Sequence, residues 1–342
     1  MKIQIPLKLF SRFFAAEMCI LSAVFSFSTP LIAAETDALK ESKVQINKNL
    51  AYLVSDRRIP FWDIMSRGIE NAARELGYEV RVYSAENNAK NELKATITAI
   101  KSKVSGLIIS PTNSSASVTI LKLAKKAGIP VVISDIGTDQ GDYVSFISSN
   151  NKDGAYQIGK VLTEKMISVG WQSGSVGIIG IPQNRLNGQM RTAGFVQALD
   201  EAGIKSASLK QQSTFSYQET YEYSKTLINN HANLRAIWLQ GSDRYQAALD
   251  AIADANKTGE ILLLCFDAEP VFLELIPQGI LVGAAMQQPY LMGEKAVYSM
   301  DRHLRGKAVE KNQQLNVLAI STKNINDKLP IIHRNVLGIE EK

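Results

Sequence analysis

The sequence is poor in the residues that build metal centres, disulfides and covalent active sites. It has 342 residues but only two cysteines and three histidines. The histidines, His231, His303 and His333, do not have the spacing of metal ligands. A nucleophile elbow, a phosphate-binding loop and a dinucleotide-binding glycine pattern are also absent, since Gly177 and Gly180 lack the required spacing. These absences favour a protein that is not an enzyme, and we expect neither a cofactor nor a metal ion.

The charge is also modest. The chain has 38 Lys and Arg against 33 Asp and Glu, a formal net charge of +5 at pH 7, without a dense basic block. This argues against nucleic acid as a partner. Of the two cysteines, Cys19 lies near the N-terminus, and Cys265 lies in the apolar run 261–266. We expect Cys265 to be a buried, unpaired residue.

The N-terminal segment has the pattern of an export signal. Basic residues within 2–12 precede a largely apolar stretch at 18–27, and small residues end at Ala34 before an acidic segment. We predict a signal peptide at residues 1–34, cleaved after Ala34, and export to the periplasm of a Gram-negative cell. A retained anchor is the weaker alternative, because the interrupted apolar stretch is shorter than the roughly 20 residues of a spanning helix.

From residue 48 onward, short apolar runs alternate with longer helical patterns. Runs such as 106–110 are continuously apolar, which is typical of strands buried on both faces of a parallel sheet. Gly77, Gly128 and Gly203 stand where left-handed C-terminal caps of helices are expected. The pattern predicts a doubly wound α/β fold. The expected strands are 49–54, 79–84, 105–110, 129–134, 144–148, 174–180, 235–240, 261–266 and 280–286.

Two blocks of this alternation, residues 48–148 and 170–285, predict two successive lobes. After the second block, residues 290–306 have a helical pattern, and a strand is expected near 315–320. A chain that completes both lobes and still has a helix to place is expected to cross back to the first lobe. Repeated crossings form a hinge, and a hinge between two lobes forms a cleft.

Two adjacent aromatic residues, Phe61 and Trp62, follow the first expected strand, 49–54, and Pro60. Open α/β sheets bind ligands at the carboxyl ends of their strands, so the pair is expected at the rim of the cleft. Flat aromatic faces suit the C–H surface of a sugar or a similar ring. The alternative is that both residues belong to the core beneath the helix that follows.

Polar residues stand at the ends of later strands. Asp135 follows strand 129–134, Asp267 follows strand 261–266, and Gln287 follows strand 280–286. Each one alone is explained equally well by a turn or a helix cap. Their joint occurrence at separate strand ends favours hydrogen bonding to a ligand in the cleft.

Arg191 and Phe215 are further candidates in the second block. Arg191 lies near the start of an expected helix, where a surface arginine is one reading. The helix dipole disfavours a cation at this place, which points to the alternative that its fork holds ligand oxygens. Phe215 stands in an otherwise polar loop. Packing under the loop and stacking on a ligand explain this phenylalanine equally well.

Together these residues resemble the periplasmic binding proteins of the ribose/galactose class, the type I two-lobed receptors for sugars. The similarity spans residues 47–322. It rests on six segments in the family's order, which are Ile59–Trp62, Gly106–Thr112, Ile129–Asp135, Arg191–Phe195, Phe266–Asp267 and Gln287–Pro289.

The resemblance implies a site and a hinge. Phe61 and Trp62 would hold a ligand ring from one side and Phe215 from the other, and the ligand hydroxyls would bond to Asp135, Arg191, Asp267 and Gln287. It implies three crossovers, placed near 149–151, 287–289 and 315–318. The N-terminal lobe would then comprise 35–149 and 289–316, and the C-terminal lobe with its tail 150–288 and 317–342.

Three positions depart from ribose receptors. Ile59 and Gly241 stand where an asparagine is usual, and Ile136 where an arginine is usual. A site built for a hydroxyl does not lose its partner without loss of affinity. We therefore expect a ligand with fewer hydroxyls on the first-lobe side, or a different polar cyclic molecule. Replacement contacts are conceivable from Arg57, Arg58, Asp243 and Arg244.

These features predict an exported, monomeric, non-enzymatic receptor that closes on a small polar, sugar-like ligand. The closed form would be read by an importer of the ATP-binding-cassette (ABC) type or, alternatively, by a membrane histidine kinase or chemoreceptor. A repressor of the lactose-repressor type is excluded, because residues 1–47 contain no helix-turn-helix pattern. An exported enzyme on the same fold would be revealed by turnover of a bound ligand.

Overall fold

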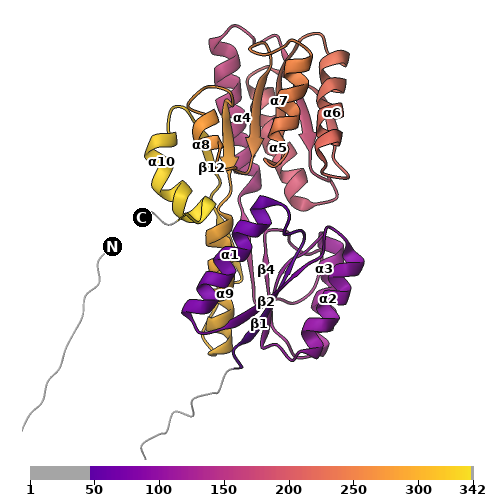
Figure 1. Ribbon diagram of the computed structural model, residues 1–342, viewed down its shortest axis with the longest axis vertical. Coiled ribbons are helices and arrows are strands. Elements are labelled where there is room, and N and C mark those ends of the chain that lie inside the picture. Colours follow the sequence, from indigo (N-terminus) through magenta and orange to yellow (C-terminus); the bar gives the residue numbers. More distant parts are fainter. Residues whose placement is uncertain (1–46, 340–342) are drawn as a thin grey trace, which may run out of the picture. The chain divides into compact units, whose positions relative to one another are not determined.

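The computed structural model describes residues 47–339, so the predicted signal peptide lies outside the described residues. Strands and helices alternate along this part of the chain and form two six-stranded sheets (Figure 1). No helix in this part of the chain combines the length and the apolar character that crossing a membrane requires.

The first sheet is formed by β1 (Asn49–Val54), β2 (Glu79–Ser84), β3 (Gly106–Ser110), β4 (Val131–Ser134), β5 (Ser145–Ser149) and β11 (Asn312–Leu315). Its helices are α1 (Pro60–Glu75), α2 (Ala89–Lys101), α3 (Ser114–Lys126) and α9 (Pro289–Leu304). The strand order is β11-β5-β4-β3-β1-β2, and all neighbours are parallel. Figure 1 shows α1 and α9 on one side of the sheet and α2 and α3 on the other. We call this unit the first lobe.

The second sheet is formed by β6 (Ser175–Gly180), β7 (Lys205–Gln211), β8 (Leu234–Leu239), β9 (Leu262–Phe266), β10 (Gly283–Met286) and β12 (Leu318–Ser321). Its helices are α4 (Asn151–Ser168), α5 (Leu186–Glu201), α6 (Tyr217–Asn230), α7 (Tyr245–Asp254), α8 (Phe272–Leu275), α10 (Ile325–Ile331) and the π-helix η1 (Ile332–Leu337). The strand order is β12-β10-β9-β8-β6-β7, in which β12 alone pairs antiparallel, with β10. We call this unit the second lobe.

Burial explains the continuously apolar strands. In β3 and β4 every residue is buried, because one hydrophobic cluster forms under α1 and α9 and another under α2 and α3. The second lobe also has a cluster on each face of its sheet. Cys265 is fully buried in one of them. The doubly wound α/β fold predicted from the sequence is therefore confirmed.

The helix ends also follow the prediction. Gly77, Gly128 and Gly203 directly follow the C-terminal cap residues of α1, α3 and α5, with φ of +72°, +69° and +68°. A side chain is strained in this left-handed region, whereas glycine adopts it freely. These glycines set the points at which the chain leaves each helix for the next strand.

The strand assignments were wrong at two sheet edges, whereas the edge strand β2 was predicted at its observed bounds. A single strand was expected near 315–320, but the structure has β11 and β12, which belong to different sheets. Strand β7 was not predicted. Both β7 and β11 lie at sheet edges and are only partly buried, so polar residues interrupt the apolar pattern that reveals an inner strand.

The chain crosses between the two lobes three times. It crosses from β5 to α4 at Asn150, from β10 to α9 at Gln287–Gln288, and from β11 to β12 at Asn316–Val317. The three crossovers were expected near these positions. Because three separate segments form the hinge, the lobes are held at one end and face each other along their strand ends.

Candidate functional site

A small cavity of about 60 Å³ lies between the two lobes. It forms where the carboxyl ends of the parallel strands of both sheets face each other, the usual place for a ligand in α/β folds. Its volume corresponds to roughly four to six water molecules. The cavity brings together all seven side chains that the sequence singled out, namely Phe61, Trp62, Asp135, Arg191, Phe215, Asp267 and Gln287.

Two aspartates enter the cavity from equivalent places in the two lobes. Asp135 follows β4 and Asp267 follows β9, and both have left-handed backbones, with φ of +65° and +71°. The amide of Asp135 donates to the Ile147 carbonyl over 2.9 Å, and that of Asp267 donates to the Ala285 carbonyl over 2.8 Å. Aspartate tolerates this conformation better than most residues. Each strand thus ends in a turn that points a carboxylate toward the other lobe.

Arg191 is held rigidly at the base of the cavity. Its side chain is 3% exposed. Nε donates to Asn151 Oδ1 over 2.8 Å, and Nη1 donates to the Gln240 carbonyl over 2.7 Å and lies 3.5 Å from Asp267 Oδ2. The guanidinium stacks on the Phe266 ring at 3.8 Å from its centroid. These contacts fix its planar fork before any ligand arrives.

Acceptor atoms in the cavity lack partners. Gln287 Nε2 donates to Asp267 Oδ1 over 2.6 Å. Gln287 Oε1 and Asp135 Oδ1, however, are buried without a hydrogen-bond partner among residues 47–339. Buried polar atoms are nearly always paired, and an unpaired one costs about 1–3 kcal/mol. A ligand that donates hydrogen bonds to these two oxygens would remove that cost.

Burial also alters the ionisation of both aspartates. It raises the pKa of Asp135 to about 7, and the nearby charge of Asp267 adds to this effect while Arg191 and Arg185 oppose it. Burial raises the pKa of Asp267 as well, against the stabilising effect of Arg191 and of the hydrogen bond from Gln287. The site therefore disfavours two bare carboxylates and favours hydrogen-bond donors beside them.

The aromatic pair belongs to the core and lines the cavity at the same time. Phe61 and Trp62 are 8% and 5% exposed, and their rings meet edge to face with centroids 4.9 Å apart. Both pack in the first-lobe cluster under α1 and also border the cavity. Phe215 borders the cavity from the loop before α6, with a left-handed backbone, φ +54°. Aromatic rings therefore enter from both lobes.

Six lining residues were missed by the sequence analysis: Ile181, Arg185, Asn187, Gln212, Gln240 and Ser242. Arg185 occupies the N-cap position of α5, where its side chain makes no capping hydrogen bond within the described chain. It stacks over Phe215 at 5.6 Å and donates to Asn87 Oδ1 of the first lobe over 3.4 Å. An arginine at a position that prefers Ser, Thr, Asp or Asn was the available signal.

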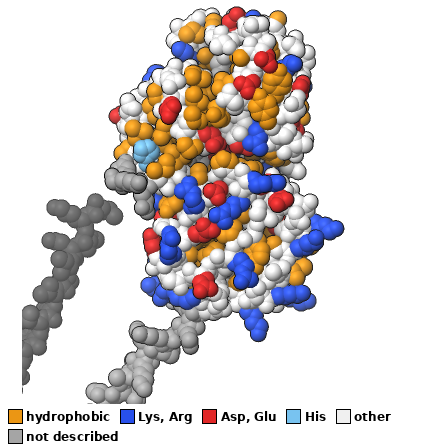
Figure 2. All heavy atoms as spheres, in the orientation of Figure 1, with side chains coloured by type: hydrophobic (Ala, Val, Ile, Leu, Met, Phe, Trp, Pro, Cys, Tyr) orange, Lys and Arg blue, Asp and Glu red, His pale blue; other side chains and the backbone are white. Residues whose placement is uncertain are grey.

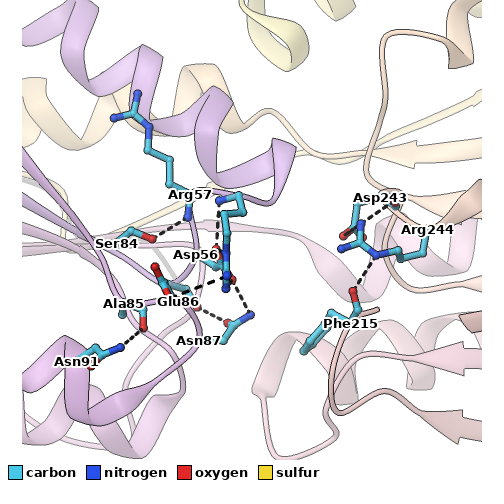
Figure 3. A network of polar contacts seen from close by, with 12 residues as sticks. Asp56, Arg57, Ser84, Ala85, Glu86, Asn87, Asn91, Phe215, Asp243 and Arg244 are labelled. Carbon is cyan, nitrogen blue, oxygen red and sulfur yellow. Dashed lines mark hydrogen bonds and ion pairs between the residues drawn. The ribbon is translucent and has the colours of Figure 1, made fainter. Parts of the chain in front are cut away.

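Four residues were considered as replacements for the missing polar contacts: Arg57, Arg58, Asp243 and Arg244. Among the described residues that line the cavity, Asp243 is the one member of this set. Arg57 is paired with Asp63 on α1. Arg58 is 67% exposed and paired with Asp56. Arg244 donates to the Phe215 carbonyl over 2.7 Å and so supports the loop that carries this phenylalanine (Figure 3).

Figure 3 also shows how the two lobes face each other at the rim of the cavity. The loops after β1 and β2, with Asp56 and Asn87, lie opposite Asp243 and Arg244 of the second lobe. Although burial alone would raise the pKa of Asp56, hydrogen bonds from Arg58 and the attraction of Arg58 and Arg244 lower it. Charges of opposite sign thus face each other across the cleft. On the outer face in Figure 2, basic and acidic side chains lie side by side over the first lobe.

A metal centre has no candidate in the described chain, since residues 47–339 contain no group of three or more His, Cys, Asp or Glu that could hold an ion. The free thiol of Cys265 is buried in the second-lobe core. Burial raises its pKa well above the ordinary value, so it is a poor nucleophile. The lining of the cavity offers hydrogen-bonding groups and aromatic faces to a ligand.

Residues 50–308 match the family model described as periplasmic binding protein domain. The ribose import binding protein RbsB of Haemophilus influenzae is 28% identical over 282 residues, which cover 82% of this chain and 94% of its own. A solute-binding protein of Agrobacterium radiobacter, solved in complex with D-arabinose, has a TM-score of 0.78 at 22% identity and covers 85% of this chain and 99% of its own. A periplasmic solute-binding protein of Actinobacillus succinogenes, solved with bound D-allose, has a TM-score of 0.76 at 19% identity, with coverage of 82% and 100%.

Proposed function

Because the chain belongs to the periplasmic binding protein domain family, we propose that it binds a small sugar or sugar-like compound between its lobes. The observation that carries this proposal is the cavity itself, where rings from both lobes and unpaired acceptor atoms face the same space. Such a space suits a ring with C–H faces and hydroxyl edges. The relatives named as ribose and D-apiose import binding proteins support this class of ligand.

In the proposed complex, the ligand ring lies between Phe61 and Trp62 on one side and Phe215 on the other. Its hydroxyls donate to the unpaired oxygens of Asp135 and Gln287 and to Asp267, and they accept from the fork of Arg191. The bonds to ionised carboxylates and to the Arg191 guanidinium are charge-assisted, and such bonds are roughly twice as strong as neutral ones. Each lobe supplies part of the set, so only the closed arrangement satisfies all of it.

We further propose that the protein is exported as residues 35–342, acts as a monomer and delivers its ligand to an ABC-type importer. The first lobe would comprise 35–149 and 289–316, and the second 150–288 and 317–342, a division that the strand order supports. Relatives that are named import binding proteins favour import over signalling to a membrane kinase or chemoreceptor. Deletion of the encoding gene should then abolish uptake of the ligand, and unchanged uptake would favour signalling.

The binding proposal is tested by a thermal-shift screen of residues 35–342 against pentoses, hexoses, polyols and small cyclic metabolites. A ligand at 100 times its dissociation constant stabilises a protein by about 2.7 kcal/mol, which is a clear shift. A response to another class of cyclic metabolite, with none to any sugar, would refute the sugar proposal and leave a receptor for that class.

Two variants test the site. Trp62→Ala and Asp267→Ala should each abolish the ligand-induced shift while the protein still unfolds cooperatively. The matched controls are Trp171→Ala and Asp254→Ala, since neither Trp171 nor Asp254 lines the cavity. Intact binding in both site variants would show that the ligand does not bind in this cavity.

A further inference from the structure

We propose that the ligand is a deoxy or methyl-substituted sugar, one edge of which is apolar and faces the first lobe. This inference rests on the proposed function and sharpens it, because it specifies the distribution of polar groups on the ligand. It concerns the two walls of the cavity, which differ in chemistry.

The first-lobe wall is almost entirely apolar. Of the described residues that this lobe contributes to the lining, Ile59, Phe61, Trp62 and Ile136 are apolar, and Asp135 is the polar one. The second-lobe and hinge side is the reverse, with nine polar residues in the lining: Arg185, Asn187, Arg191, Gln212, Gln240, Ser242, Asp243, Asp267 and Gln287.

The apolar wall is one continuous surface. Ile136 is 2% exposed and packs in the same cluster as Phe61 and Trp62, and Ile59 packs against that cluster. From the opposite lobe, Ile181, 8% exposed, also reaches the cavity. Asp135 is the single polar side chain that this lobe contributes to the lining, so hydrogen bonding on this side is confined to one place in the wall.

A hydroxyl against this wall would be desolvated with at most one partner. Burying a hydroxyl without a hydrogen bond is unfavourable, whereas a methyl group at the same place gains from leaving water. An apolar pocket rejects an added hydroxyl by factors up to about a hundredfold. We therefore expect at least a tenfold preference, about 1.4 kcal/mol, for the sugar that carries a methyl group in place of a hydroxymethyl group.

The experiment compares sugars that differ by one hydroxyl. Binding of residues 35–342 is measured by calorimetry with D-fucose and D-galactose, L-rhamnose and L-mannose, D-quinovose and D-glucose, and 5-deoxy-D-ribose and D-ribose. A preference of tenfold or more for the deoxy member of a pair supports the inference. A smaller or reversed preference in every pair that binds overturns it and leaves the proposed function standing. If none of the eight sugars binds, the inference falls, and the thermal-shift screen decides the proposed function separately.

The variant Ile59→Asn tests whether the preference for deoxy sugars comes from the apolar first-lobe wall. Ile59 is the N-cap residue of α1 and has a β backbone, so asparagine fits there and its oxygen can cap the helix. Ile59→Asn adds an amide donor to the apolar wall and should reduce the deoxy preference at least threefold. The control, Ile97→Asn, changes an isoleucine that is 41% exposed on α2 and should leave the preference unchanged. An unchanged preference in a folded Ile59→Asn protein would overturn the assignment of the apolar edge to this wall.

Discussion

Asp135 makes closure of the ligand-free protein depend on pH. In this structure burial raises the pKa of Asp135 to about 7, and we expect the pKa to lie near the ordinary value of 3.8 when the lobes move apart and water reaches the carboxyl. Closure therefore takes up a proton between these two values. The stability of the closed form is fully present below pH 3.8 and is lost as the pH rises through 7.

The size of the effect follows from these pKa values. One pH unit corresponds to about 1.4 kcal/mol, so the interval from 3.8 to about 7 amounts to about 4 kcal/mol at most. Of this, about 2.5 kcal/mol accrues between pH 5 and pH 8. Asp135→Asn removes the titration and keeps the backbone, because asparagine also adopts φ near +65°.

The assay uses the ligand-free protein at pH 5 and pH 8, as wild type and as Asp135→Asn. Small-angle scattering reports the radius of gyration, and urea unfolding reports stability. Raising the pH should increase the radius of gyration of the wild type more than that of the variant, or it should lower the free energy of unfolding of the wild type more than that of the variant. The difference in the second case should be up to about 2.5 kcal/mol. Asp267, whose pKa burial also raises, is present in both proteins, and its charge acts on a titrating group at position 135 in the wild type alone. If both measurements respond identically to pH in the two proteins, the role assigned to Asp135 is wrong.

Two further substitutions test the packing around the site. Arg191→Met leaves the buried carboxylate of Asp267, 3.5 Å from the guanidinium, with Gln287 as its remaining partner; urea unfolding should show a loss of roughly 3–5 kcal/mol. A loss below 1 kcal/mol would contradict the buried ion pair. In Gly68→Ala, the added Cβ would lie 2.2 Å from the Tyr290 carbonyl oxygen, so α1 and α9 must separate. The melting temperature should fall by the equivalent of about 1–3 kcal/mol, and an unchanged melting temperature would contradict this close approach.

The inner strands were predictable because a strand that is buried on both faces has a continuously apolar sequence. Each of the nine expected strands contains or overlaps a strand of the structure. Eight of them are inner strands, whose burial on both faces requires apolar residues, and the ninth, the edge strand β2, alternates polar and apolar residues. The edge strands β7 and β11 expose one side to water, and their sequences, KSASLKQ and NQQL, resemble loops. Their pairing depends on the neighbouring strand rather than on a local pattern.

The part of the site that lies at the carboxyl ends of the strands could be predicted from the sequence. All seven singled-out side chains line one cavity, because parallel strands place their carboxyl ends at one edge of each sheet. Their roles in binding stay predictions. Arg185, Asn187 and Gln212 were missed because their approach to the cavity depends on the loops and on the distance between the lobes. Arg185 reaches as far as Asn87 in the other lobe, a contact to which no spacing in the sequence points.

The two strand-end aspartates indicate where specificity has changed. Asp135 and Asp267 share a left-handed backbone and a hydrogen bond to the neighbouring strand, so the turn that presents the carboxylate is the same in both lobes. Their surroundings differ, because Asp267 has Arg191 and Gln287 as partners, whereas an oxygen of Asp135 has none among the described residues and the next residue is Ile136. Since the backbone is set by the turn, the residue at position 136 can change without disturbing it. Polarity at that position is therefore a means of changing the ligand while the fold and the carboxylate stay in place.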